Sequence, residues 1–434
     1  MNPLQGIFSG DSLRRTLANA GWLYFDQISR ALVVLVAFGA VARRLGPEQF
    51  GVLSYAVALP AIFLPVAMLG LDFVLVRDLV RLRDRAEALL GTGAWLKLAG
   101  ALLAVGLAVV GMIFVPADHP ARPLAWITLL TLLAQPFLLF DFHFQSQTAS
   151  KYPAMARLIA CLVANGGRLW LALTDAPLVW FAWAAVAEAV LYALGLAMAY
   201  WASGAPTFKL WRNFDAGLAR RLLADAWPLF LADVAIALCL RVDQLLLSSL
   251  AGAESLGRYA AAFRLADAAE FFSLALINSY FPRLIVLHGQ GGGAFEAALK
   301  RFFQVMTWFS LAVAVVLSAT APWVVQWVLG PQFAGVAPVL ALLTWANIFV
   351  TQVAVRGKWF LMEGRQRQSL VFFVIGAAVH LSGVWMLAPR WGALGVAGSF
   401  FITQIVMVIG APFLFASTRE AAVLALRSFL PRRR

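Results

Sequence analysis

Charged residues are scarce in this 434-residue chain, at 13% of the sequence, whereas soluble proteins have about 25%. Hydrophobic residues make up 62%, and the mean hydropathy is +0.83. The deficit of charge excludes an ordinary soluble domain and indicates a polytopic membrane protein. Cysteine and histidine are also rare, since both cysteines lie within apolar runs and the four histidines are scattered. We therefore expect no disulfide framework, no metal site and no redox chemistry.

Nucleotide-binding and catalytic motifs are missing as well. The Gly357-Lys358 pair has Gln352 in the place of the first glycine of a phosphate-binding loop, and Trp359 in the place of Ser or Thr. The chain is thus not predicted to be an ATPase or another enzyme, and no cofactor is expected. Energy for any transport has to come from a gradient or from the substrate.

Long apolar runs dominate what is present. With about 20 apolar residues to a crossing, twelve spans are predicted. They lie near 19–42, 52–76, 98–115, 124–149, 158–173, 178–202, 223–250, 259–282, 302–328, 338–362, 369–388 and 393–416. The fifth is short and is interrupted by polar and glycine residues at 165–168. The first is interpreted as a retained span rather than a signal peptide, because no cleavage site of small residues is evident.

The distribution of lysine and arginine predicts the orientation. The segments before the first span and after every even-numbered one carry 23 of the 34 basic residues, whereas the opposite loops carry five. Because basic loops stay in the cytoplasm, both termini are expected there, in the plasma or inner membrane. The net charge of +13 is therefore mostly a matter of topology, and no nucleic-acid partner is expected. The basic C-terminal end is expected to contact anionic membrane lipids.

An internal repeat joins two stretches 206 residues apart. Gly46, Glu48 and Gly51, with Pro47 between them, match Gly252, Glu254 and Gly257. A glycine that ends one helix, followed by an N-terminal first turn with Pro or Glu, predicts a tight corner between two spans. Arg77 and Arg283 share the same offset, which indicates a duplication of the whole half.

The repeat predicts the domain organisation. Residues 1–202 form an N-terminal six-helix bundle, 203–222 a cytoplasmic linker, 223–416 a C-terminal six-helix bundle, and 417–434 a basic cytoplasmic tail. Because six spans is an even number, both halves enter the membrane from the same side. The predicted fold is an all-α membrane protein with two bundles related as parallel repeats around a central cavity.

Six basic residues remain inside the predicted spans, and each costs about 2.5–3.5 kcal/mol at a helix centre. They are Arg30, Arg168, Arg241, Arg264, Arg356 and Lys358. Such residues form ion pairs, extend to the membrane surface, or line a cavity. The cavity interpretation predicts an anionic ligand, most naturally a phosphate, since guanidinium groups match phosphate oxygens.

Acidic neighbours separate these alternatives in part. Asp26 is four residues from Arg30 and Asp267 is three from Arg264, so each pair shares a helix face and can neutralise itself. Arg356 and Lys358 lie close enough to a helix end to reach the surface. Arg241 and Asp243 point to different sides of their helix and need partners elsewhere. Arg168 and Arg241 are therefore the favoured ligand contacts.

The corner at 44–51, Arg-Leu-Gly-Pro-Glu-Gln-Phe-Gly, resembles a signature of polysaccharide or O-antigen flippases. These form the Wzx-type oligosaccharide flippase family of the multidrug/oligosaccharidyl-lipid/polysaccharide exporter superfamily. Weaker similarities follow in the same order along nearly the whole chain. They include the stretch 70–77, Asp243, Phe281-Pro282-Arg283, the stretch 329–333 and Glu363-Gly364-Arg365.

The resemblance implies a function. It implies alternating access of two bundles, which would move a polyprenyl-diphosphate-linked oligosaccharide from the cytoplasmic to the periplasmic or outer leaflet. Partners would be this glycan, membrane lipids, and the polymerase or glycosyltransferases of the same pathway. Some members couple transport to protons or sodium. The candidates for that role here are Asp26, Asp233, Asp243 and Asp267.

Two other classes stay open from the residues. A cation-coupled multidrug antiporter of the same superfamily would prefer an acidic cavity, and nine acids against six bases inside the spans allow one. A membrane-embedded glycosyltransferase is disfavoured, because such enzymes carry large outer loops with catalytic groups and the predicted outer loops are short.

Overall fold

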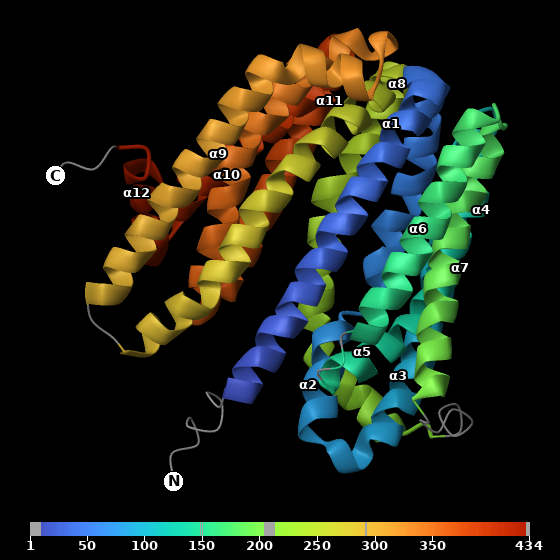
Figure 1. Cartoon of the computed structure of the whole chain (residues 1–434). Coiled ribbons are helices and arrows are strands. Elements are labelled where there is room, and N and C mark those ends of the chain that lie inside the picture. Colours follow the sequence, from blue (N-terminus) through green and yellow to red (C-terminus); the bar gives the residue numbers. More distant parts are fainter. Residues whose placement is uncertain (1–9, 148, 150, 204–212, 291–292, 431–434) are drawn as a thin grey trace. The chain divides into compact units, whose positions relative to one another are not determined.

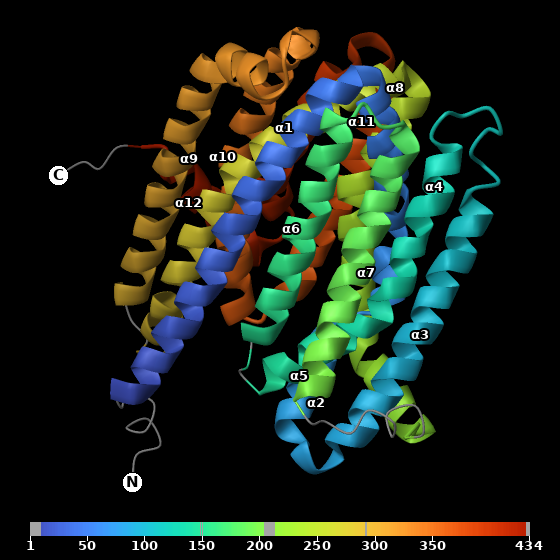
Figure 2. The same cartoon turned by 45° about the vertical axis from the view of Figure 1, so that its right-hand side comes forward.

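The computed structural model describes residues 10–147, 149, 151–203, 213–290 and 293–430. Side chains are described from Arg30 onward, apart from positions 83, 239 and 240. The described part is built of helices and contains no strand. Within each of its two compact units, long helices run alongside one another (Figures 1 and 2). Helices satisfy every backbone hydrogen bond internally, which the apolar core of a membrane requires.

The helices form two compact units. Unit 1 comprises Met1–Arg44 and Leu59–Val234, and unit 2 comprises Leu45–Ala58 and Ala235–Arg434. Unit 2 thus includes a short segment from the first half of the chain, and unit 1 includes the beginning of helix α8 (Ala216–Gln290). Most of the predicted linker at 203–222 lies outside the described residues.

Unit 1 contains the first seven helices, apart from Leu45–Ala58 of α1, and the beginning of the eighth. These are α1 (Gly10–Met68), α2 (Leu71–Arg81), α3 (Ala86–Gly111), α4 (Arg122–Leu129), α5 (Leu139–Ser146), α6 (Lys151–Leu173) and α7 (Leu178–Ala202), with short 3-10 segments at Arg83–Arg85 and Leu130–Leu138. Helices α6 and α7 pack side by side, and α7 also contacts α4 (Figure 2). The core of unit 1 includes Leu75, Leu89 and Leu222.

Unit 2 contains the remaining helices. These are α8 (Ala216–Gln290), α9 (Gly293–Val328), α10 (Ala337–Met362), α11 (Gln366–Ile405) and α12 (Arg419–Arg427), with short segments at Pro331–Val336, Val406–Gly410, Ala411–Leu414 and Ala416–Thr418. Helix α10 packs against α9 and α11. Residues 419–427 of the predicted tail form α12, and its Ala421 and Leu424 enter the core of this unit. Residues 431–434 lie outside the described part.

Nine continuous helical stretches of the described residues are long and apolar enough to cross a membrane. Three of them turn at a glycine, because α1, α8 and α11 contain non-helical backbone at Gly46, Gly252 and Gly392. The 75 residues of α8 would extend about 110 Å as a straight helix, against a membrane core of about 30 Å. Each broken helix is long enough for two crossings, as the prediction of twelve spans requires.

Several helices extend beyond the predicted spans, and in two cases the difference changes the place of a charged residue. The third was expected at 98–115, whereas α3 begins at Ala86, so Lys97 lies within the helix and not in a loop. The fifth was expected at 158–173, but α6 runs from Lys151 without a break through Asn165 and Arg168. Asn165 is buried and Arg168 pairs with Glu188 on α7, so the helix tolerates these polar residues.

The two corners have matching backbones. Gly46 has φ 69° and ψ 173°, and Gly252 has φ 83° and ψ 168°, a region open essentially to glycine alone. The corners also touch in a reciprocal manner within unit 2. A Cβ on Gly51 would lie 1.8 Å from the carbonyl oxygen of Ala253, and one on Gly257 would lie 1.7 Å from that of Pro47. Gly51 and Gly257 are equivalent in the repeat, as are Pro47 and Ala253, so the contact is symmetric.

Ion pairs hold the beginning of α8 within unit 1. Arg77 on α2 contacts Asp225 at 2.5 Å and the buried Asp78 at 2.8 Å. Gly70 lets the two helices approach, since a Cβ there would lie 2.6 Å from the backbone nitrogen of Phe230. These contacts explain why this part of α8 belongs with the first half of the chain.

Candidate functional site in the membrane

Arg168 lies in the last third of α6, five residues before its end at Leu173, and pairs with the neighbouring helix α7. Its Nη2 lies 2.7 Å from Oε2 of Glu188, and its Nη1 donates to Oδ1 of Asn165 at 2.9 Å. The Asn165 amide donates in turn to the backbone oxygen of Cys161, which keeps Oδ1 directed at Arg168. The side chains of Arg168 and Glu188 are 22% and 35% exposed. The guanidinium is therefore fixed in place but still accessible.

Arg30 belongs to the same neighbourhood. Cys161 on α6 lies within electrostatic reach of Arg30, Arg168 and Glu188, so two of the six predicted cations, both in unit 1, each lie near this part of α6. Arg30 makes a contact of its own. The side chain of Asp26, its predicted partner, lies outside the described part.

A second charged pair in unit 1 was missed by the sequence analysis. Lys97 on α3 is fully buried, at 0% exposure, and its Nζ lies 2.8 Å from Oδ1 of Asp72. The ammonium also lies 4.6 Å from the centre of the Phe142 ring. Asp233, a predicted coupling residue, is within electrostatic reach of Asp72. The pairing offsets the cost of burying the lysine.

Arg157 on α6 belongs to a third charged group in unit 1. Its Nη2 donates to Oδ2 of Asp141 at 2.9 Å and to the hydroxyl of Tyr192 at 2.6 Å. The Tyr192 hydroxyl donates to the same carboxylate oxygen at 3.1 Å. Helices α5, α6 and α7 are thereby joined by one closed set of hydrogen bonds. Arg157 was assigned to a cytoplasmic loop by the sequence analysis, one residue before its predicted span.

Arg356 and Lys358 in unit 2 both contact aromatic rings. Arg356 is 3% exposed, and its guanidinium lies 4.9 Å from the ring of Phe372 and 5.7 Å from that of Phe360. It also donates to the backbone oxygen of Met407. Lys358 lies 4.8 Å from the ring of Phe281. Arg356 is thus enclosed by protein, and a substrate could reach it only if this part of unit 2 opened.

The other predicted cations and acids of unit 2 lie on α8. Arg241 is half-buried and lies within electrostatic reach of Tyr259. Arg264 and Asp267 are exposed, and Arg264 makes a contact of its own.

Asp243 is the centre of a buried polar cluster in unit 2. Its Oδ1 accepts from the backbone N–H of Gln244 at 2.8 Å, and its Oδ2 accepts from the hydroxyl of Tyr259 at 2.9 Å. Nε2 of His380 lies 3.4 Å from Oδ2, and Nδ1 of His380 lies 3.1 Å from the hydroxyl of Ser399. Asp243 thus has partners elsewhere, as predicted from its position on the helix. His380 was interpreted as a buried, satisfied residue, and its proximity to an acid could not be predicted.

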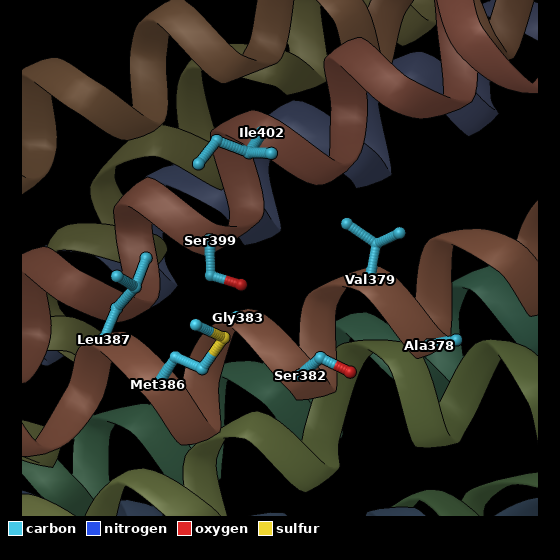
Figure 3. A pocket seen from close by; sticks show the side chains of 8 residues that line it. All are labelled: Ala378, Val379, Ser382, Gly383, Met386, Leu387, Ser399 and Ile402. Atoms are coloured by element: carbon cyan, nitrogen blue, oxygen red, sulfur yellow. The ribbon is translucent and has the colours of Figure 1, made fainter.

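An apolar groove adjoins this cluster. It has a volume of about 510 Å³ and lies between the two segments of α11 that flank Gly392. Ala378, Ser382 and Met386 line it from one segment, and Ser399 and Ile402 from the other (Figure 3). The Ser399 hydroxyl points into the space between the segments. Ser399 therefore lies at both the groove and the cluster.

Glu270 faces a small cavity of about 10 Å³ in unit 2. Ser273 on the same helix, Ser310 on α9, and Thr344 and Asn347 on α10 share this cavity. The sequence analysis counted Glu270 among the intramembrane acids but assigned it no role. In the described part of the chain, His, Cys, Asp and Glu form no group of three that could hold a metal ion.

The structure resembles transporters of known structure over nearly the whole chain. It matches an inward-facing multidrug resistance transporter of the MATE family, in the MOP superfamily, with a TM-score of 0.69 and 16% identity over 92% of this chain and 96% of that one. It matches the lipid II flippase MurJ in an inward closed conformation with a TM-score of 0.70 and 14% identity over 95% of this chain and 90% of that one. At such identity the likeness shows the fold alone, and it confirms the predicted all-α membrane fold.

Sequence comparison gives a family. A Shigella dysenteriae protein named "Putative O-antigen transporter" is 24% identical over 188 residues, which are 43% of this chain and 47% of that protein. The aligned segment thus spans about half the length of that relative. A family model described as "Polysaccharide biosynthesis protein" matches residues 16–288. These matches confirm the predicted resemblance. Because the model covers more than half of its sequence, this multi-pass membrane chain belongs to the polysaccharide biosynthesis protein family.

Proposed function

We propose that the chain is a flippase and not an enzyme. It moves a polyprenyl-diphosphate-linked oligosaccharide from the cytoplasmic to the periplasmic leaflet by alternating access, for surface polysaccharide synthesis. Membership of the polysaccharide biosynthesis family supports the pathway. The observation that carries the chemistry is Arg168, a partly exposed guanidinium within an apolar helix that is long enough to span a membrane.

Arg168 suits a diphosphate for three reasons. Its planar fork of donors can bind two phosphate oxygens at once. Its orientation is fixed through Asn165, so little side-chain freedom is lost on binding. Its carboxylate partner Glu188 is itself partly exposed. A phosphate can therefore displace the Glu188 carboxylate from Arg168 without leaving a buried charge unpaired.

Arg30 shares the neighbourhood of Arg168 and is proposed to add positive charge to the same site. Arg241, Arg264 and Lys358 are proposed as contacts contributed by unit 2. Arg356 is proposed to contact substrate only after the aromatic rings around it separate, since it is enclosed in this structure.

The distribution of basic residues supports an orientation with both termini in the cytoplasm. We place the chain in the inner membrane. An inside-negative potential then favours the outward movement of an anion by about 2.3 kcal/mol per charge per 100 mV. Asp26, Asp233 and Asp267 are proposed as candidates for coupling to a proton or sodium gradient. If one of them has this role, its replacement by Asn removes the pH or sodium dependence of transport.

The experiment uses cells that lack the protein. Lipid-linked glycans are extracted, and their accessibility is measured from each face of the membrane. We expect complete glycans to accumulate in the cytoplasmic leaflet and the wild-type chain to restore transport. Normal glycan traffic with altered retention of cationic drugs would instead favour a multidrug antiporter, the class to which one structural match belongs.

Three variants test the site. Arg168→Ala is expected to abolish rescue, and Arg168→Lys to restore it in part, because charge remains but the two-pronged contact is lost. Glu188→Gln keeps the guanidinium and removes its competitor, so rescue should persist. Arg44→Ala is the matched control, since Arg44 also pairs with a carboxylate, that of Asp175 at 2.6 Å, but beside the predicted corner. Loss of rescue in Glu188→Gln equal to that in Arg168→Ala would show a purely structural ion pair.

A further inference from the structure

Glu270 is an acidic residue in the middle of a membrane-length helix. It lies at the centre of the span predicted at 259–282 and well inside α8, so its side chain cannot extend to either membrane surface. Within the described part of the chain, Glu270 forms no ion pair and no hydrogen bond, whereas Asp72, Asp141 and Glu188 are each paired with a basic residue. A carboxylate at this depth is costly without a positive partner.

The surroundings of Glu270 add negative rather than positive charge. Asp267, one turn earlier on α8, is exposed and lies within electrostatic reach of the Glu270 carboxyl group. The residues that line the cavity in front of Glu270 from α9 and α10 carry no charge. Glu270 is only half-buried, so a small ion can reach it. The electrostatic environment therefore favours a cation over an anion beside Glu270.

The cavity in front of Glu270 is lined by oxygen-bearing side chains from three helices. They are Ser273 on α8, Ser310 on α9, and Thr344 and Asn347 on α10. Carboxylate and amide oxygens are the ligands that hard cations prefer, and hydroxyl oxygens have lone pairs of the same kind. With the carboxylate, five such side chains converge on one small space.

Three of these side chains use protons elsewhere and leave lone pairs for the cavity. Asn347 donates through Nδ2 to the backbone oxygen of Ala266 at 3.0 Å, which leaves its Oδ1 to bind a ligand. The hydroxyl of Thr344 donates to a backbone oxygen of its own helix at 2.7 Å. The hydroxyl of Ser310 donates to Oγ1 of Thr351 at 3.0 Å, because the proton of Thr351 goes to the backbone oxygen of Asn347 at 2.8 Å. A carbonyl oxygen can only accept, which fixes these directions.

The size of the cavity and the spacing of its oxygens suit one small ion. Its volume of about 10 Å³ is close to that of one water-sized sphere. The Oγ atoms of Ser273 and Ser310 are 3.5 Å apart, whereas a direct hydroxyl hydrogen bond is about 2.7–2.8 Å long. Na⁺ has nearly the radius of Ca²⁺, whose oxygen ligands lie at about 2.3–2.6 Å, so two ligands at right angles are about 3.3–3.7 Å apart. The observed spacing matches two ligands of one such ion.

We propose that Glu270 and the four lining side chains form a Na⁺-binding site within unit 2. Glu270 supplies the one negative charge that balances a monovalent ion, and the other side chains supply neutral oxygens. Mg²⁺ usually keeps several of its waters, for which a cavity of this size has no room. Bound Na⁺ would link α8, α9 and α10. The inference concerns ion binding and does not depend on what the chain transports.

Thermal unfolding of the purified full chain in lipid nanodiscs tests the site. The unfolding temperature is measured while Na⁺ replaces choline at constant ionic strength and pH. A ligand that binds only the folded state stabilises it, so the temperature should rise with Na⁺, and Glu270→Gln should abolish the rise. Glu296→Gln is the matched control, because it makes the same change at an exposed position of α9 and should respond as the wild type does. A wild type that ignores Na⁺, or a full response in Glu270→Gln, would overturn the proposal.

Binding of radioactive sodium gives a second test, which keeps the carboxylate in place. Thr344→Val removes one proposed ligand and retains the side-chain shape, so the Na⁺ concentration for half-saturation should rise. Thr320→Val is its control, since the Thr320 hydroxyl also donates to its own helix but does not line the cavity. Equal Na⁺ affinity in the two variants would contradict the assigned ligands. Stability that rises as pH falls but does not respond to Na⁺, with this rise lost in Glu270→Gln, would show that Glu270 binds a proton and not Na⁺.

Discussion

The symmetric contact of the two corners predicts a large effect from adding one methyl group. In Gly51→Ala the new Cβ would lie 1.8 Å from the Ala253 carbonyl oxygen and 2.8 Å from the Gly257 backbone nitrogen. Both are backbone atoms, so the segments themselves have to separate by more than 1 Å to reach ordinary contact. Overpacking of this kind costs about 1–3 kcal/mol or more. Alanine regains up to about 1 kcal/mol in a helix, so a net loss of about 2 kcal/mol is expected.

The double variant makes the test specific. Gly51→Ala and Gly257→Ala introduce steric clashes at the same contact. Once one substitution has separated the two segments, the second methyl group clashes less. The combined loss of stability should be smaller than the sum by about 0.5–3 kcal/mol. Thermal unfolding of the purified chain, followed by tryptophan fluorescence, measures all three variants. Gly106→Ala is the control, since a Cβ there meets nothing within 4 Å. If the corner variants unfold at the temperature of this control, the corners do not touch.

Further predictions concern the buried charges. Asp72→Asn leaves the fully buried Lys97 without its carboxylate partner. The loss of stability should be somewhat less than the roughly 3–5 kcal/mol of a fully buried broken pair, because Asp72 is 40% exposed. Lys97→Met removes the charge itself and should cause a smaller loss of stability in the same unfolding assay. Arg356→Met should leave stability unchanged or higher, since an apolar side chain of similar volume replaces a buried cation, whereas Arg356→Ala should cost about 2–4 kcal/mol through the void beside Phe372. Transport by Arg356→Met, measured by glycan accessibility, decides whether Arg356 contacts substrate. Tyr192→Phe should lose about 1–1.5 kcal/mol, because Arg157 and Asp141 lose a shared partner.

The sequence predicted what depends on local pattern. Apolar run length gives the helices, and the Gly-Pro-Glu corner with its repeat gives the two left-handed glycines at Gly46 and Gly252. Helix periodicity predicts that Asp243 and Arg241 do not pair with each other, and Asp243 has other partners in Tyr259 and His380. Each of these inferences needs only residues within a few turns of one another.

What depends on distant packing could not be predicted. Asp243 and His380 are 137 residues apart, and nothing in either local stretch indicates the other. Lys97 was used to mark the start of a span because basic residues usually lie at membrane surfaces. Its carboxylate partner comes from a different helix, and that pairing allows a lysine within an apolar helix. The same reasoning placed Arg157 in a loop before its predicted span. In the structure Arg157 lies on α6 and hydrogen-bonds to Asp141 and Tyr192 within unit 1.

The duplication supplies a common frame, but the chemistry on it is not duplicated. Asp243 and Tyr259 fall opposite Ala37 and Leu53 at the 206-residue offset, so the first half has no equivalent of their buried hydrogen bond. Conversely, the last two predicted spans, 369–388 and 393–416, contain no Lys, Arg, Asp or Glu, so the second half has no equivalent of Arg168 and Glu188. The Arg168–Glu188 pair and the cluster around Asp243 therefore each belong to one half alone. A variant in one half should leave the contacts of the other intact: Arg168→Ala should keep the contacts around Asp243, and Asp243→Asn should keep the Arg168–Glu188 contact.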